Sequence, residues 1–268
     1  MLLGKNSFDH YNNESCLMKF FLLILFTGAV VLCNGQDVMT VMTEAQKMED
    51  AMQDVEALAT YKRALSMDSM NVILLCKCSE LSSRIGARIK DDETIQQQYY
   101  KAAREYARQA LRLNPSLSEA NFVMALVMGN QAMTASGGKE KIAAVKALKK
   151  YADLAIRFDP QNYKAWFVLG KWYYEISDLN YFELTAVKVF FGALPPASFD
   201  DAVRCFERVK SLNSQFVLNY LALAKAYKKK DELSMARQNI HVMLNLQNQT
   251  EDDEGIKKEG RDLLKKWD

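Results

Sequence analysis

The stretch AWFVLGKWYY, residues 165–174, says most about the fold of this chain. Trp166, Leu169 and Tyr173 follow one another at spacings of three and four residues, so they form one apolar stripe on a helix. Gly170 lies in the same stripe, where the missing side chain lets a second helix approach closely. The stretch therefore predicts a packing seam between two helices rather than a pocket for a cofactor.

The same spacing recurs further along the chain, at Tyr220, Leu223, Ala224 and Tyr227. Two copies in register match the first-helix signature of the tetratricopeptide repeat. The second helix of that repeat carries small and large residues at set spacings. Copies of this second pattern begin at Ala57, Ala103, Leu148, Ala202 and Ala236, and Phe206 is the large residue of the fourth copy. The turns MDSM, LNPS, FDPQ and LNSQ each place Asp or Asn before Pro or Ser, residues that end one helix and cap the next.

The composition agrees with an all-α protein. Only 11 Gly and 4 Pro occur among 268 residues, and 49% of the residues are hydrophobic, which is enough for a substantial core. The formal charge of +2 and the absence of any nucleic-acid-binding motif argue against a nucleic-acid partner. The sequence predicts a tetratricopeptide-like α-solenoid of helical hairpins, covering about 38–66, 70–112, 117–157, 162–212 and 215–246.

Three of these repeats are longer than a regular one. The two pattern positions lie 16 residues apart from Tyr220 to Ala236, but 36 residues apart from Trp166 to Ala202. The extra segment, LNYFELTAVKVFFGALPPAS, contains an apolar helical piece at residues 181–191. This piece has two interpretations: it fills the interior of the superhelix, or it lines a pocket for an acyl chain. After the last repeat, TEDDEG begins a polar helix that we expect to cap the solenoid.

The N-terminus predicts export. An apolar run at residues 20–33 follows Lys19 and has the length of a signal-peptide core, shorter than a membrane span. We expect translation to start at Met18, cleavage after Gly35, a signal peptide at residues 1–35 and a soluble domain at 36–268. The mature protein would be periplasmic or secreted in a bacterium. A lipid anchor at Cys33 and a retained membrane anchor are the alternatives.

Chemistry-bearing residues are sparse in the predicted mature chain. His241 is its only histidine, and Cys76, Cys78 and Cys205 are interpreted as buried thiols. No nucleophile elbow, phosphate loop or zinc-protease motif occurs. The sequence therefore predicts no enzymatic activity, no metal and no cofactor.

Two sets of residues follow from the repeat register. The structural anchors are predicted to be Trp166, Leu169, Gly170, Tyr173, Ala202, Phe206, Tyr220, Leu223, Tyr227 and Ala236. The concave groove is predicted to be lined by Phe122, Lys164, Phe167, Lys171, Tyr174, Leu221, Lys225 and Lys228. Lysines among aromatic residues suit an anionic, partly apolar ligand, such as a peptide carboxylate or a phospholipid headgroup. The alternative is that these lysines form a solvated helical face.

The segment from Asp159 to the C-terminus resembles the regulator of microtubule dynamics family. The resemblance is carried by the tryptophan-rich helix at 166–174, the insert, Pro195-Pro196-Ala197-Ser198, Phe216, Asn219, Lys225, Thr250-Glu251 and Leu263-Leu264. It implies an all-α adaptor-like domain whose eukaryotic relatives are linked to microtubules and, in one branch, to phospholipid binding at membrane contacts. A microtubule role requires a cytosolic domain, whereas the leader predicts export.

These observations predict an exported, non-catalytic scaffold that binds a protein or peptide along a concave groove. The main alternative is a lipid-binding or lipid-transfer domain with an internal apolar pocket and phospholipid as its ligand. A further alternative, for a eukaryotic host, is a membrane-anchored and microtubule-associated protein.

Overall fold

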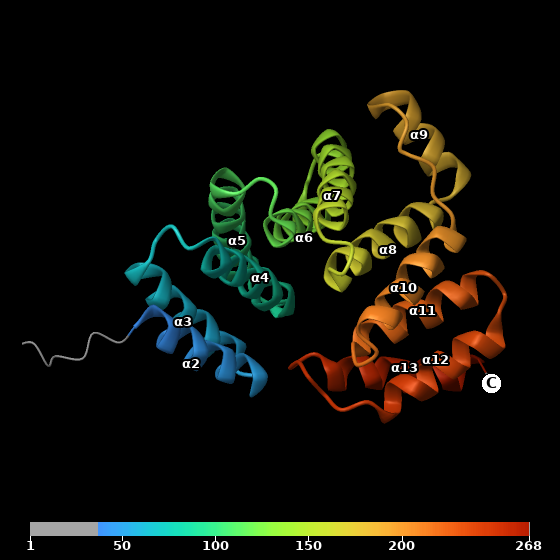
Figure 1. The fold of residues 1–268 in the computed structure, drawn as a ribbon. Helices are drawn as coiled ribbons and strands as arrows, with labels where there is room; N and C mark the ends of the chain where they lie inside the picture. The colour runs from blue at the N-terminus through green and yellow to red at the C-terminus, as the bar shows by residue number, and fades with distance from the viewer. Residues whose placement is uncertain (1–36, 268) are drawn as a thin grey trace, which may run out of the picture. The chain divides into compact units, whose positions relative to one another are not determined.

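The computed structural model describes residues 37–267, which form twelve α-helices and no β-strand (Figure 1). The helices are α2 (Val38–Asp50), α3 (Asp54–Met67), α4 (Val72–Arg88), α5 (Glu93–Leu113), α6 (Ser118–Thr134), α7 (Gly138–Phe158), α8 (Tyr163–Ser177), α9 (Tyr181–Phe191), α10 (Phe199–Leu212), α11 (Val217–Lys229), α12 (Leu233–Asn245) and α13 (Asp253–Trp267). The predicted signal peptide lies outside the described residues. None of the helices at 37–267 is long and apolar enough to span a bilayer.

Within residues 37–267, five helical hairpins follow one another. α2 packs on α3, α4 on α5, α6 on α7, α8 on α10, and α11 on α12. Each hairpin also contacts the next, through α3 with α4, α5 with α6, α7 with α8, and α10 with α11. The predicted all-α solenoid is thereby confirmed, and α13 packs on the last hairpin, through α11 and α12.

Short polar turns separate the hairpins because polar side chains satisfy the free N–H groups at helix starts. The side chains of Asn71, Asn162 and Ser198 each accept a hydrogen bond from the backbone N–H three residues later, at 3.0–3.2 Å. These caps begin α4, α8 and α10, so the local sequence sets the start of two hairpins and of the second helix of the α8–α10 hairpin.

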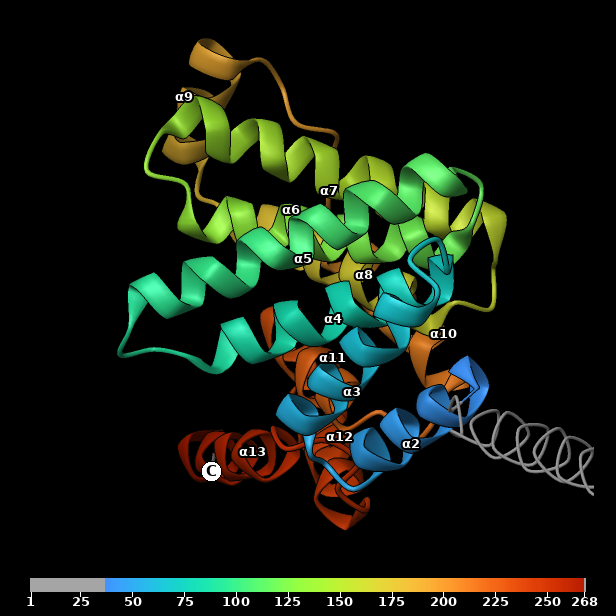
Figure 2. The same cartoon turned by 90° about the vertical axis from the view of Figure 1, so that its left-hand side faces the viewer.

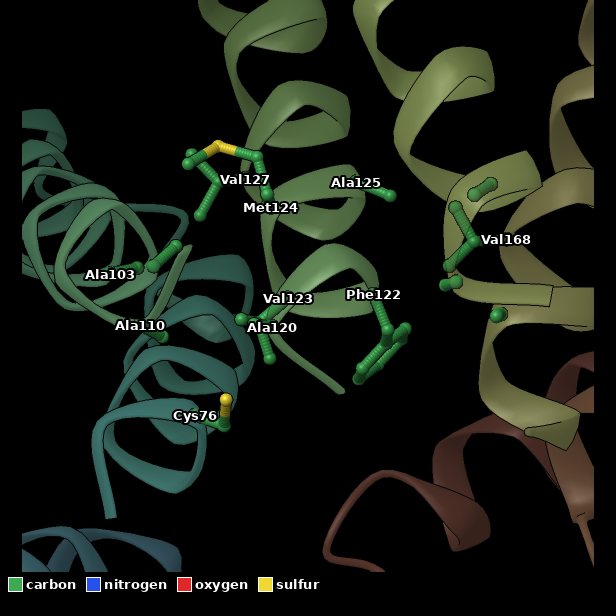
Figure 3. Packing of buried hydrophobic residues seen from close by; sticks show 14 of the residues in the cluster. Cys76, Ala103, Ala110, Ala120, Phe122, Val123, Met124, Ala125, Val127 and Val168 are labelled. Atoms are coloured by element: carbon green, nitrogen blue, oxygen red, sulfur yellow. The ribbon is translucent and has the colours of Figure 1, made fainter. Parts of the chain in front are cut away.

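The second helices approach their neighbours closely because they present alanine to them. Ala103, Ala107 and Ala110 of α5 are fully buried against α4 and α6. Figure 3 shows Ala103 and Ala110 on one side of α6 and Val168 of α8 on the other. This cluster is continuous from α4 to α8, so the second, third and fourth hairpins share one core.

Eight of the ten anchor residues are buried: Leu169, Gly170, Ala202, Phe206, Tyr220, Leu223, Tyr227 and Ala236. Trp166 and Tyr173 are half-buried at the edge of the core, where Trp166 Nε1 donates to the Pro160 carbonyl at 3.0 Å. Trp172, which the repeat pattern leaves out, is buried, and its Nε1 donates to the Val145 carbonyl at 3.0 Å. α8 therefore buries a further face against α7.

The insert helix α9 is a helix, as the sequence predicts, but it does not fill the interior. None of its residues is buried, and Phe182 and Phe190 are 81% and 76% exposed. α9 contacts α7, where Lys146 Nζ donates to the Phe191 carbonyl at 3.0 Å. The interior-filling interpretation is wrong because the hairpins pack on one another directly and leave α9 outside their core (Figure 1).

The three cysteines of the described region are buried free thiols, as predicted. Burial raises the pKa of each thiol, to about 12 for Cys78 and Cys205. They are therefore protonated core residues at neutral pH.

Candidate protein-binding face

The first helices of successive hairpins form a common inner face. α4 contacts α6, α6 contacts α8, and α8 contacts α11, although one helix separates each of the first two pairs along the chain and two helices separate the third. In Figure 2 the first two hairpins, α2–α5, face the viewer, and α6, α8 and α11 lie behind them. The predicted groove residues lie on α6, α8 and α11.

A partly buried ion pair crosses the inner face. Lys164 Nζ on α8 lies 2.7 and 2.8 Å from the two carboxylate oxygens of Glu80 on α4, and 3.9 Å from Glu119 Oε1 on α6. The ammonium also lies 5.6 Å from the centre of the Phe122 ring. Burial opposes the charge of Lys164, but attraction to the two acids outweighs it and raises the pKa of this lysine. Lys164 thus joins the second and fourth hairpins.

The two acids beside Lys164 titrate differently. Burial acts to raise the pKa of Glu80, but Lys164, Lys77 and other cations outweigh it and lower the pKa overall. Burial and repulsion by Glu80 raise the pKa of Glu119. Glu80 is therefore the main counterion of Lys164, and Glu119 is the acid that protonates first as the pH falls.

A row of half-buried aromatic rings lies along α8. The Phe167 ring centre lies 5.0 Å from that of Phe216, at the start of α11, and 5.8 Å from that of Phe206 on α10. The Tyr174 ring lies 5.5 Å from the ring of Phe199. The rings are partly covered by neighbouring helices and partly open, which leaves apolar contact area for a partner.

The lysines beside this row have acidic partners. Lys171 is exposed and pairs with Glu175, one turn later on α8, at 2.9 Å. Lys225 of α11 pairs with Glu259 of α13 at 2.6 Å. Lys228 is half-buried. The lysines predicted in the groove thus belong mainly to ion pairs within the chain.

Two predicted groove residues are in the core instead. Phe122 is 4% exposed and Leu221 is 3% exposed, so neither offers surface to a ligand. Phe122 belongs to the cluster that joins α4, α6 and α8, and Leu221 packs with the residues beneath α13. The correction has one cause: neighbouring hairpins and the C-terminal helix cover positions that are open in a regular groove.

Sequence reasoning missed the acids that neutralise these lysines. Glu175 could have been found, because it lies four residues after Lys171 on the same helix. Glu80 comes from another hairpin and Glu259 from α13, 84 and 34 residues away from their lysines, and no local pattern marks them.

A second surface feature lies on the outer side, on α7. A cleft of about 480 Å³ is lined by Lys146, Lys149, Lys150, Asp153, Leu154, Arg157 and Pro195. Four of these residues are cations and one is an acid. Lys146 links the cleft to the C-terminal end of α9, whose apolar side chains are exposed. Basic and apolar surfaces are therefore contiguous here.

Metal chemistry has no evident place in the described part of the chain. Within residues 37–267, no group of three or more His, Cys, Asp or Glu side chains is arranged to hold a metal ion. His241 is exposed on α12.

Comparison with known families gives a match over most of the chain. The model of the family described as regulator of microtubule dynamics protein 1-3 matches residues 41–268. A regulator of microtubule dynamics protein 1 from Caenorhabditis elegans is 26% identical over 229 residues, which cover 83% of this chain and 97% of the relative. The Bos taurus protein of that name is 27% identical over 164 residues, 61% of this chain and 51% of the relative. The match thus spans nearly all of the nematode relative and about half of the bovine one.

Solved structures support the fold. A thermophilic TPR protein from Thermus thermophilus superposes with a TM-score of 0.63 at 13% identity, covering 85% of this chain and 98% of the other. PilW, a type IV pilus biogenesis factor, superposes with a TM-score of 0.51 at 16% identity, covering 87% and 88%. At such identities the likeness concerns the tetratricopeptide-like architecture alone.

Proposed function

Because the chain belongs to the regulator of microtubule dynamics family, we propose that it is a non-catalytic scaffold that binds a protein partner along its inner face. The observation that carries the proposal is the row of half-buried rings on α8, Phe167 and Tyr174, beside the exposed Lys171. Rings held by neighbouring helices offer contact area at little cost in conformational entropy. An extended segment with apolar and acidic side chains fits this combination.

The names of the relatives support a partner in the microtubule system. We propose that this chain binds microtubules or a microtubule-associated protein through Lys171, Tyr174 and Lys228. Polymerised microtubules are the first partner to test, because they can be sedimented together with a bound protein and the bound fraction measured.

The test compares wild type with a Lys171→Glu/Lys228→Glu variant. Reversing two charges at the inner face should weaken co-sedimentation at least about tenfold, which corresponds to about 1.4 kcal/mol. Lys258→Glu is the matched control, because Lys258 is exposed and pairs with Asp262 one turn later, as Lys171 does with Glu175. Equal loss in the control, or none in the double variant, rejects the inner face as the microtubule site. Wild type that stays in the supernatant rejects the microtubule partner itself.

A second candidate function is binding to an anionic lipid surface. The exposed aromatic residues of α9 and the basic cleft of α7 support it, because interfacial helices combine apolar side chains with nearby cations. Sedimentation with vesicles of phosphatidylserine and phosphatidylcholine tests it. A Phe182→Ser/Phe190→Ser variant should lose at least half of the vesicle-bound fraction. Equal binding of wild type to vesicles of phosphatidylcholine alone contradicts the electrostatic part of this proposal.

Export of the mature protein, supported by the apolar run at residues 20–33, is an alternative to the microtubule role, because that role requires a cytosolic domain. Sequencing the N-terminus of the protein purified from its host tests it. A mature chain that starts at Gln36 supports cleavage, and a chain that retains residues 20–33 contradicts it.

A further inference from the structure

An acidic turn in the C-terminal part of the chain is bound by the first two hairpins. The side chain of Asp252 accepts two hydrogen bonds from Arg88 at the end of α4, from Nε at 2.7 Å and from Nη2 at 2.8 Å. Glu251 accepts one from Arg88 Nη1 and one from the N–H of Asp54, both at 2.8 Å. These bonds join residues between 163 and 197 positions apart. In Figures 1 and 2 the segment leading into α13 lies beside the start of α3.

The receiving site is built from residues that hold one another in place. Asp54 begins α3, and the preceding residue, Gln53, supplies no side-chain cap, so the N–H of Asp54 needs an outside acceptor. Arg84 binds the carboxylate of Asp54 through Nε at 2.7 Å and Nη2 at 2.5 Å. Arg88 Nη2 lies 2.7 Å from the same carboxylate. Asp54 is buried, and its carboxylate is held by both arginines, so it positions Arg88 beside the start of α3.

The charge of this site favours an anion. Lys77 and Arg84 pair with Glu49, and both are also attracted by Glu80 of α4. Apart from the turn, the acid that Arg88 contacts is Asp54, which it shares with Arg84, so the other N–H groups of Arg88 can bind an anion when the turn is absent. The guanidinium of Arg88 binds the carboxylate of Asp252 through two parallel N–H groups. Its Nη1 and the N–H of Asp54 at the start of α3 bind the adjacent carboxylate, that of Glu251. This arrangement selects two adjacent carboxylates.

The acidic turn is itself rigid. The carboxylate of Asp253 accepts hydrogen bonds from the backbone N–H groups of Gln249 and Thr250, at 2.7 and 3.0 Å, and from Thr250 Oγ1 at 2.8 Å. This turn presents Glu251 and Asp252 outward. Their side chains keep 35% and 39% of their surface open to water, so the contact can exchange.

We propose that Arg88 and the start of α3 form a binding site for a pair of adjacent carboxylates, which the chain fills with its own Glu251 and Asp252. An acidic segment of another protein binds the same site when it displaces this turn. While the turn is bound, contacts close a circle from α4 through α6, α8, α11 and α13 back to α4. Displacing the turn breaks that circle of contacts beside the inner face, which would regulate binding there. This effect on binding is the one part of the proposal that rests on the proposed function.

A labelled peptide with the sequence of residues 246–256 tests the site by fluorescence anisotropy at low salt. The peptide should bind an E251Q/D252N variant of the whole chain at least about tenfold more tightly than wild type, because the tethered acids compete at an effective concentration in the millimolar range. Adding Arg88→Gln to that variant should abolish binding. Glu254→Gln is the matched control, since Glu254 lies in the same segment but pairs with Arg261, and it should behave as wild type.

Several results overturn the proposal: equal affinity for wild type and E251Q/D252N, binding that survives Arg88→Gln, or no binding to E251Q/D252N. Hydrogen exchange of unmodified wild type provides a measurement that needs no variant. Raising sodium chloride from about 0.05 to 0.5 M should speed exchange of the Asp54 amide and not of amides in the middle of α3. An unchanged Asp54 amide contradicts a displaceable turn. Neither assay uses microtubules, so a negative result in either one does not reject the proposed function. A negative co-sedimentation result likewise does not reject the site at Arg88.

Discussion

Gly170 sets the distance between α8 and α10. A Cβ added at this position would lie 2.6 Å from Phe206 Cε1 and 3.1 Å from Cys205 Cβ. Phe206 is fully buried, so its ring has no free space to move into. We expect Gly170→Ala to lower the free energy of unfolding by about 1–3 kcal/mol through overpacking, despite the better helix propensity of alanine. Urea denaturation measures this change.

The control for this substitution is Gly255 in α13. A Cβ there meets nothing within 4 Å, so Gly255→Ala should raise the free energy of unfolding by up to about 1 kcal/mol. Opposite signs at the two glycines are the expected result. A stabilising Gly170→Ala contradicts the close contact.

Glu80 and Glu119 should affect stability in opposite ways. The pKa of Glu80 is lowered by folding, so its contribution is complete above the unfolded pKa and is lost as the pH falls through the lower folded value. The pKa of Glu119 is raised, so its ionisation in the folded state costs stability at neutral pH. At pH 7 we expect Glu80→Gln to lower the free energy of unfolding by about 2 kcal/mol, and Glu119→Gln to leave it unchanged or slightly higher.

Denaturation at several pH values measures both variants. The loss caused by Glu80→Gln should shrink below the ordinary carboxyl pKa of 4.5, because Glu80 then protonates in the unfolded chain while it stays ionised in the folded one, and it should vanish below the lower folded pKa. If Glu119→Gln lowers the free energy of unfolding at pH 7 as much as Glu80→Gln does, Glu80 is not the main counterion of Lys164.

Among the helices, α9 is distinctive because it is apolar and yet unburied. Surface substitutions usually change stability by no more than about 0.5 kcal/mol, whereas truncating a buried phenylalanine costs about 3–5 kcal/mol. We therefore expect Phe182→Ser/Phe190→Ser to leave the free energy of unfolding nearly unchanged and Phe206→Ala to lower it strongly. Thermal denaturation distinguishes the two, and a large loss in the α9 variant would show that the helix packs inside.

The helices themselves could be predicted from spacing, but their surroundings could not. The period of Trp166, Leu169 and Tyr173 locates α8 and its contact with α10. It does not reveal that Trp172 is buried against α7, because that contact depends on how the hairpins stack. The sequence of α9 suggests a buried helix for the same reason. An apolar helix face predicts that another surface covers it, but it does not identify that surface.

At the scale of the whole molecule, the sequence predicts which positions of the candidate site lie on first helices, but not which acidic residues pair with its lysines. The repeat register places Lys164, Lys171 and Lys225 on first helices, where the structure has them. Their charge balance depends on the curvature of the array, which brings α4 to α8 and α13 to α11. The contact of Arg88 with the acidic turn has the same origin, since nothing local relates residues 163 positions apart.

The C-terminal segment holds the array together through apolar packing and through ion pairs, and variants can remove each of these separately. Ile256, Leu263, Leu264 and Trp267 of α13 pack on the core of the last hairpin, whereas Glu251 and Asp252 hold the first two hairpins. Covering four half-buried apolar side chains contributes about 4 kcal/mol in total, and partly exposed ion pairs contribute about 1 kcal/mol or less each.

A chain that ends at Asn248 should therefore unfold about 10 °C below wild type, since about 1 kcal/mol corresponds to 2–4 °C at this size. E251Q/D252N should unfold within a few degrees of wild type, and Lys265→Ser/Lys266→Ser, at exposed positions of α13, should not differ from it. Differential scanning calorimetry measures all three. If E251Q/D252N unfolds as early as the truncated chain, the ion pairs and not the apolar cap hold the array together, and displacing the acidic turn would unfold the protein rather than open it.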